Sequence, residues 1–140
     1  MSKVAVVFWS GTGNTEAMAN AVKVGAEEKG AQVSVFTAAD FTADSANAFD
    51  AIAFGCPAMG DEVLEEDEFQ PMFDAVKSAV TGKKVALFGS YGWGDGQWMR
   101  DWEEACAASG ITLAVESVMA NDAPDDEATA ACKALGAALA

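Results

Sequence analysis

The sequence lacks histidine and is poor in basic residues. Histidine is absent from all 140 positions, and 8 lysines and arginines stand against 22 aspartates and glutamates, which gives a formal net charge of −14. A field of that sign repels nucleic acid and anionic lipid, whereas it attracts basic protein surfaces. We therefore expect no nucleic-acid partner, no membrane partner and a docking surface for basic proteins.

Cysteine is scarce and scattered. Cys56, Cys106 and Cys132 form no C-x-x-C motif, and no histidine is present to complete a zinc site. A disulfide framework and a metal site are therefore not expected, and a reducing cytoplasm fits best. We interpret the three cysteines as small buried apolar side chains.

Long hydrophobic runs are also missing. The apolar run at residues 4–9 is too short for a membrane span, and the charged region and cleavage site of a signal peptide are absent. The 140 residues are 51% hydrophobic. This length and composition predict one packed domain over residues 1–140.

Strand and helix patterns alternate along the chain. Segment 38–49 is predicted to be a short helix or an irregular crossover. Such alternation predicts right-handed βαβ crossovers and an α/β fold with a parallel sheet covered by helices on both faces. Ligands bind such sheets beyond the carboxyl ends of the strands. The predicted strands are 3–9, 32–36, 51–55, 85–89 and 112–119, and the predicted helices are 15–29, 69–80, 97–109 and 124–140.

A polar, glycine-rich loop joins the first strand to the first helix. A helix N-terminus offers free backbone N–H groups and a partial positive charge, and glycines let an anion approach the backbone. The lysine of a Walker A loop is absent, Glu16 replaces the last glycine of a dinucleotide fingerprint, and there is no cysteine nucleophile. The loop therefore predicts a cradle for a terminal monophosphate. Its residues are Ser10, Gly11, Thr12, Gly13, Asn14 and Thr15.

Two further loops carry side chains that suit a flat ligand. Trp93 is flanked by glycines, and offset stacking on a planar ring gains about 0.5–1.5 kcal/mol beyond burial. Met59 offers a soft, polarisable side chain for the opposite face. Each of the two, taken singly, is also compatible with an ordinary place in the core. The second loop contributes Pro57, Ala58, Met59, Gly60, Asp61 and Glu62, and the third contributes Ser90, Tyr91, Gly92, Trp93, Gly94 and Asp95.

The run Ser-Gly-Thr-Gly-Asn-Thr at residues 10–15 resembles the FMN-phosphate loop of the flavodoxins. The whole chain is similar to the short-chain branch of that family. The resemblance implies a flavodoxin-like three-layer sandwich with a five-stranded parallel sheet of order 2-1-3-4-5. It also implies one non-covalently bound FMN, held by all three loops.

The same resemblance implies individual roles for loop residues. Trp93 and Met59 would sandwich the isoalloxazine, the Gly60 carbonyl would accept a hydrogen bond from flavin N5–H after reduction, and Glu62 would accept from ring N3–H. Backbone N–H groups of residues 92–94 would meet the pyrimidine edge. Polar parts of the ligand would contact Ser90 and Asp95, and Asn121 would reach the ribityl chain.

The implied function is a monomeric, low-potential one-electron carrier, not an enzyme, that can replace ferredoxin. A Gly60 hydrogen bond would stabilise the neutral semiquinone, and acidic loops would disfavour the fully reduced anion. One carboxylate about 10 Å away contributes roughly 0.4 kcal/mol in water-like dielectric, or roughly 18 mV for one electron. The implied partners are ferredoxin- or flavodoxin-dependent oxidoreductases and flavin reductases with basic docking surfaces.

Two other functions fit an α/β chain of this kind. An FMN-dependent NAD(P)H quinone reductase on the same fold needs a substrate pocket from an insertion or a dimer partner, and this short chain has no such insertion. A phosphoryl-accepting receiver domain needs an aspartate where this chain has Gly55, and acidic metal ligands where it has Ser10 and Gly11. The loops therefore favour the carrier over both.

Overall fold

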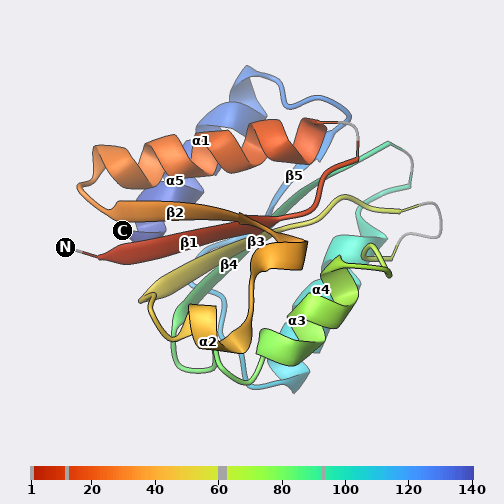
Figure 1. The fold of residues 1–140 in the computed structure, drawn as a ribbon. Coiled ribbons are helices and arrows are strands. Elements are labelled where there is room, and N and C mark those ends of the chain that lie inside the picture. The colour runs from red at the N-terminus through yellow and green to blue at the C-terminus, as the bar shows by residue number, and fades with distance from the viewer. Residues whose placement is uncertain (1, 12, 60–62, 93) are drawn as a thin grey trace.

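A computed structural model describes residues 2–11, 13–59, 63–92 and 94–140. Its centre is a sheet of five parallel strands in the order β2-β1-β3-β4-β5 (Figure 1). This confirms the predicted sheet order. The strands are β1 (Lys3–Phe8), β2 (Gln32–Thr37), β3 (Ala51–Gly55), β4 (Lys84–Tyr91) and β5 (Val118–Asn121).

Helices cover both faces of the sheet, which produces two apolar cores. Figure 1 shows α1 (Asn14–Glu28) and α5 (Asp126–Leu139) on one face, and α3 (Phe69–Val76) and α4 (Gln97–Ala108) on the other. Alternate residues of each central strand point to opposite cores, as Val4 and Ala5 do on β1. The crossover after β2 contains a short 3-10 helix (Ala38–Asp40) and α2 (Ala43–Ala46), in agreement with the predicted short helix.

Three predicted boundaries were wrong. The fifth strand was predicted at 112–119, but β5 covers Val118–Asn121, and before it only Leu113 forms an isolated bridge, to Val85. β4 continues to Tyr91 because its last residues pair with the end of β5. The predicted helix 69–80 ends at Val76 in the structure. The prediction placed its end too late because the apolar spacing continues to buried Val80, beyond the helix.

Helices α1 and α5 cross with their backbones in contact. A Cβ added at Gly25 would collide with the carbonyl oxygen of Lys133, and a Cβ added at Gly136 would collide with that of Val22. Glycine is therefore required at both positions for packing, although it is a poor helix former. The crossing fixes α1 on the sheet, and α1 begins directly after the glycine-rich loop.

The two ends of the chain lie together, away from the loops that end the strands. Figure 1 shows the N- and C-termini at the end of the sheet where β1 begins. The loops after β1, β3 and β4 lie at the opposite end. Within the described ranges, the helices are too short or too polar to cross a membrane.

Candidate functional site

A cleft of about 300 Å³ lies at the carboxyl ends of β1, β3 and β4. All three predicted loops contribute to it, and the sheet order explains why: β1 and β3 are neighbours, as are β3 and β4. None of the described residues that line it is a lysine or an arginine. They are Trp9, Gly11, Asn14, Pro57, Ala58, Met59, Ser90, Tyr91, Gly92 and Asp122.

The phosphate loop (residues 10–15) is shaped by its own polar groups. Ser10 Oγ accepts hydrogen bonds from the backbone N–H of Gly13, at 3.0 Å, and of Glu16, at 3.4 Å. Gly13 is the N-cap residue of α1 and has φ 94°, a conformation that favours glycine. The loop therefore leads into a helix N-terminus, where backbone N–H groups and the helix dipole favour an anion.

A buried hydrogen bond joins the phosphate loop to the third loop. The hydroxyls of Thr15 and Ser90 are 3.0 Å apart, and both residues are buried. The backbone N–H of Ala58 also donates to the Ser90 carbonyl at 2.9 Å. Ser90 therefore connects all three loops, and the Thr15 hydroxyl is directed towards it.

The ring loop (residues 56–65) is closed at its base by Cys56. The Glu65 backbone N–H donates to Cys56 Sγ at 3.4 Å, and the Trp98 indole N–H donates to the Cys56 carbonyl at 3.1 Å. Further out, the Met59 N–H donates to the Val63 carbonyl at 3.0 Å. The base of the ring loop is thus anchored to both β3 and α4.

Glu65 is a buried carboxylate, 5% exposed, that organises the start of α3. Its two oxygens accept backbone N–H bonds from Asp67, Glu68 and Phe69 at 2.7–2.8 Å. Burial alone would raise the pKa of Glu65, but these three donors outweigh it and hold the pKa below its usual range. Glu65 is therefore an anion in the folded protein at neutral pH.

The three cysteines are buried free thiols, as predicted. Burial raises the pKa of Cys56 and of Cys132 to about 12, and that of Cys106 to about 11. All three are therefore protonated at neutral pH and are poor nucleophiles. The Cys56 thiol accepts the Glu65 N–H at the base of the ring loop.

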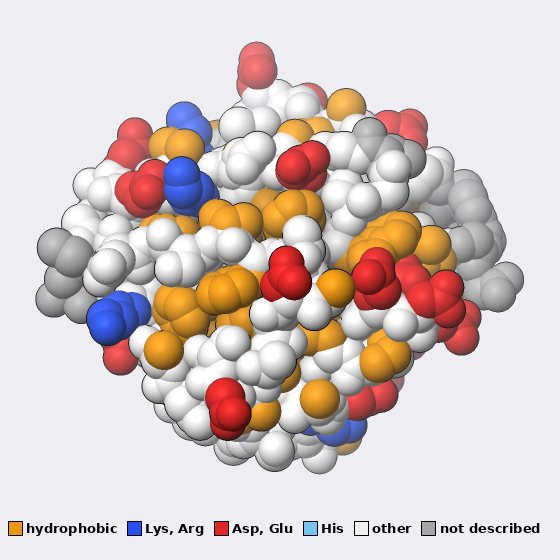
Figure 2. Space-filling view, viewed as in Figure 1, with side chains coloured by type: hydrophobic (Ala, Val, Ile, Leu, Met, Phe, Trp, Pro, Cys, Tyr) orange, Lys and Arg blue, Asp and Glu red, His pale blue; other side chains and the backbone are white. Residues whose placement is uncertain are grey.

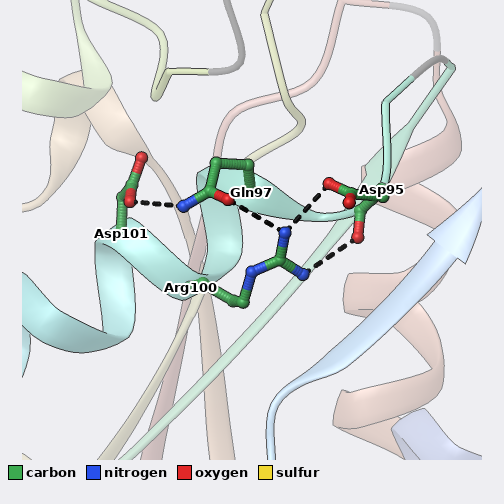
Figure 3. A network of polar contacts seen from close by, with 4 residues as sticks. All are labelled: Asp95, Gln97, Arg100 and Asp101. Carbon is green, nitrogen blue, oxygen red and sulfur yellow. Dashed lines mark hydrogen bonds and ion pairs between the residues drawn. The ribbon is translucent and has the colours of Figure 1, made fainter.

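Asp95 is paired with an arginine outside the cleft (Figure 3). Arg100 donates to the Asp95 carboxylate at 2.9 Å and to its backbone carbonyl at 3.1 Å. Gln97 accepts from Arg100 and donates to Asp101. Asp95 is exposed and is not among the residues that line the cleft. Its predicted contact with the ligand stays a prediction.

Two described residues of the cleft were not predicted. Trp9 is the last residue of the predicted strand 3–9, and nothing in the sequence around it indicates a place in the cleft. Asp122 follows β5 with φ 57°, the only positive φ among the described non-glycine residues, and its N–H donates to the Tyr91 carbonyl at 2.7 Å. Asn121 is exposed and lines a neighbouring groove between β5 and α5.

Five predicted residues lie outside the described ranges: Thr12, Gly60, Asp61, Glu62 and Trp93. The stacking role of Trp93, the hydrogen bonds of Gly60 and Glu62, and the charge contributed by Asp61 therefore stay predictions.

Trp98 and Trp102 provide a matched test of the base of the ring loop. Both are on α4 and almost fully buried, but the Trp102 indole N–H has no hydrogen-bond partner among the described residues. We expect Trp102→Phe to change the free energy of unfolding by less than about 1 kcal/mol, because it removes an unsatisfied donor. Trp98→Phe leaves the Cys56 carbonyl without this donor, and we expect it to cost about 1–3 kcal/mol more.

Urea unfolding of the two apoprotein variants, at equal m-values, measures this difference. Equal losses in Trp98→Phe and Trp102→Phe would show that the Cys56 bond contributes nothing to the fold.

Acidic side chains gather around the ring loop. Between Gly30 and Lys77 the sequence has ten carboxylates and no lysine or arginine. Figure 2 shows a group of Asp and Glu side chains on the right of this face, near the N-terminal end of α3, whereas most Lys and Arg side chains lie on the left, where further Asp and Glu side chains accompany them. This asymmetry produces a negative field beside the cleft.

The fold and the cleft define a class of protein that binds a phosphorylated planar cofactor at the carboxyl edge of a parallel sheet. The profile of the family described as "Flavodoxin" matches residues 6–136. A flavodoxin of Clostridium beijerinckii is 46% identical over 121 residues, which are 86% of this chain and 88% of that one. A flavodoxin of Megasphaera elsdenii is 43% identical over 137 residues, 98% of each chain.

The structural comparison agrees with the sequences. The solution structure of two-electron reduced Megasphaera elsdenii flavodoxin matches with a TM-score of 0.90, over 97% of both chains. The chain belongs to the flavodoxin family. It is an electron-transfer protein and not an enzyme, its cofactor is FMN, and it exchanges electrons with other redox proteins.

The described residues fit FMN. The phosphate loop offers uncharged donors at a helix N-terminus, and Gly11 lets the Trp9 indole lie against the loop, since a Cβ there would be 3.1 Å from the ring. Ala58, Met59 and Tyr91 add apolar and aromatic surface to the same cleft. One cleft thus combines donors for a phosphate with surface for a ring system.

Proposed function

We propose that the chain is a low-potential carrier of single electrons, with FMN in the cleft at the carboxyl ends of β1, β3 and β4. When bound, FMN supplies the electron-accepting ring. The proposal depends on one observation: a phosphate loop without charged side chains borders a partly apolar cleft in a strongly acidic protein.

The protein contributes binding, orientation and electrostatics. The phosphate would be held by residues 10–15, and the ring by the ring loop and residues 90–95. Glu65 is fixed as an anion at the end of the ring loop, and the exposed carboxylates of Glu66, Asp67 and Glu68 follow it directly. Added negative charge on the cofactor is disfavoured in this field, which lowers the potential for the second electron.

The acidic surface supports a proposal about partners. Ferredoxin- or flavodoxin-dependent oxidoreductases and flavin reductases would dock basic surfaces on the carboxylates near the start of α3. Such contacts are transient, fast and sensitive to salt. Three buried thiols support a reducing cytoplasm as the compartment. We further propose one domain over residues 1–140 that acts as a monomer.

Anaerobic stepwise reduction tests the proposal. The purified protein, saturated with FMN, is titrated while its visible spectrum and the solution potential are recorded. We expect two resolved one-electron steps, with the lower potential below that of free FMN. Bleaching in one two-electron step, or reduction by NADPH alone, would instead support a quinone reductase. Failure of the apoprotein to bind FMN would refute the proposed site.

A further inference from the structure

The indole of Trp9 spans the space between the phosphate loop and the start of α3. At one edge, Cη2 and Cζ3 lie so close to Gly11 that a Cβ there would be 3.1 and 3.3 Å from them. At the other edge, Nε1 donates to Glu68 Oε1 at 3.0 Å. Trp9 lines the cleft and also a second cavity, of about 370 Å³, which Glu68 and Ser10 line as well.

Glu68 connects Trp9 to the base of the ring loop. The Glu68 backbone N–H donates to the buried Glu65 carboxylate at 2.7 Å, and the Glu65 backbone N–H donates to Cys56 Sγ at 3.4 Å. A continuous path of contacts therefore runs from Gly11 through Trp9, Glu68 and Glu65 to Cys56. It joins the phosphate loop to the ring loop without passing through the ligand.

Among the described residues, the Glu68 side chain makes no hydrogen bond besides the one to Trp9. Glu68 is the N-cap residue of α3, yet its side chain makes no capping hydrogen bond, and that capping is done by Glu65. Glu68 is also exposed, so a carboxylate there is not needed for core packing. Its one described side-chain hydrogen bond is the bond to Trp9.

We propose that Glu68 is a positioning residue that acts through Trp9 and makes the two halves of the cleft cooperative. An anion on the phosphate loop fixes Gly11 and hence the indole packed beneath it. The bond to Glu68 passes this restraint to the start of α3 and the ring loop, which then binds an isoalloxazine at a lower ordering cost. This inference rests on the proposed placement of FMN in the cleft.

Plain electrostatics predicts a different effect for the removal of Glu68. A carboxylate near the phosphate loop repels a bound anion, so its loss should strengthen phosphate binding. Loss of the positioning bond should instead weaken the effect of phosphate on the ring half. The two explanations are therefore distinguishable by experiment.

Riboflavin and inorganic phosphate, used together, separate the two halves of the cleft. Riboflavin is FMN without its phosphate, so its dissociation constant from the apoprotein reports on the ring half. It is measured by flavin fluorescence with and without saturating inorganic phosphate, at constant ionic strength. We expect phosphate to lower this constant about fivefold or more in the wild type, within the usual range of coupling between sites.

The variants test whether the Trp9–Glu68 bond carries this coupling. The phosphate effect is the ratio of the riboflavin dissociation constants without and with phosphate. Glu68→Ala and Trp9→Phe should each bring this ratio close to one, and the double variant should lower it no further than either single variant. Glu68→Gln keeps an acceptor for the indole N–H and should retain most of the effect. Glu66→Ala removes an exposed charge from the same stretch and should keep the wild-type effect of phosphate on riboflavin binding.

Three results would overturn the inference. They are the absence of a phosphate effect in the wild type, an unchanged effect in Glu68→Ala, and an equal loss in Glu66→Ala. FMN binding by the wild-type apoprotein is measured in parallel. Normal FMN binding with unchanged coupling in Glu68→Ala would refute the inference alone, whereas no FMN binding would refute the proposed function itself.

Discussion

Replacement of Gly136 by alanine is expected to lower the free energy of unfolding by about 3 kcal/mol or more. The new Cβ would collide with the Val22 carbonyl oxygen and would lie 3.0 Å from the Ala26 nitrogen, both of which are rigid backbone atoms. The helices α1 and α5 must therefore separate. Intrinsic helix propensity acts in the other direction and favours alanine by about 1 kcal/mol.

Urea unfolding of the apoprotein measures the loss without a contribution from cofactor affinity. Ala130→Gly, at an exposed position of α5, is the matched control and should cost about 1 kcal/mol through helix propensity alone. Gly25→Ala should resemble Gly136→Ala, and the double variant should lose less than the sum, because one separation of the helices relieves both collisions. A Gly136→Ala protein as stable as the wild type would show that the two backbones are not in contact.

Glu65→Ala is expected to cost about 3 kcal/mol, because three backbone N–H groups at the start of α3 lose a charged acceptor. The neighbouring Glu66→Ala removes an equal charge from an exposed side chain and should change stability by about 0.5 kcal/mol or less. A loss shared by both variants would assign the effect to net charge and not to the hydrogen bonds.

The stabilisation by Glu65 also depends on pH. Because its pKa is lowered in the folded state, its contribution is present above the carboxyl pKa of the unfolded chain and is lost as the pH falls through the folded pKa. The stability difference between the wild type and Glu65→Ala should therefore be constant near neutral pH and narrow in acid. A difference that stays constant to low pH would contradict the lowered pKa.

Features that depend on local pattern could be predicted from the sequence. Buried strands such as 51–55 and the run of polar and glycine residues at 10–15 can be recognised from neighbouring residues alone. A parallel sheet then brings the loops after its strands together at one edge. The start of β5 could not be predicted, because apolar residues occur on both sides of Glu116 and Ser117 in the run 112–119. Tertiary contacts separate part of this run from the sheet, where Ser117 donates to Glu103 at 2.7 Å.

Long-range contacts decide the parts of the site that the sequence did not predict. Nothing local to Trp9 indicates that its indole reaches Glu68, which is 59 positions away. Arg100, one helical turn into α4, holds the Asp95 carboxylate, and the contact of Asp95 with the ligand stays a prediction. Gly25 and Gly136 look like weak points in their helices until the crossing is seen.

The location of the two termini has a practical consequence for attaching this carrier to a surface. Both ends of the chain lie at the end of the sheet opposite the cleft (Figure 1). A short tether added after Ala140 would orient the cleft away from an electrode or bead, with the acidic surface facing the solution. Immobilised in this way, the protein would keep its docking surface accessible to diffusing partners, while direct electron exchange with the electrode would have to cross the length of the sheet.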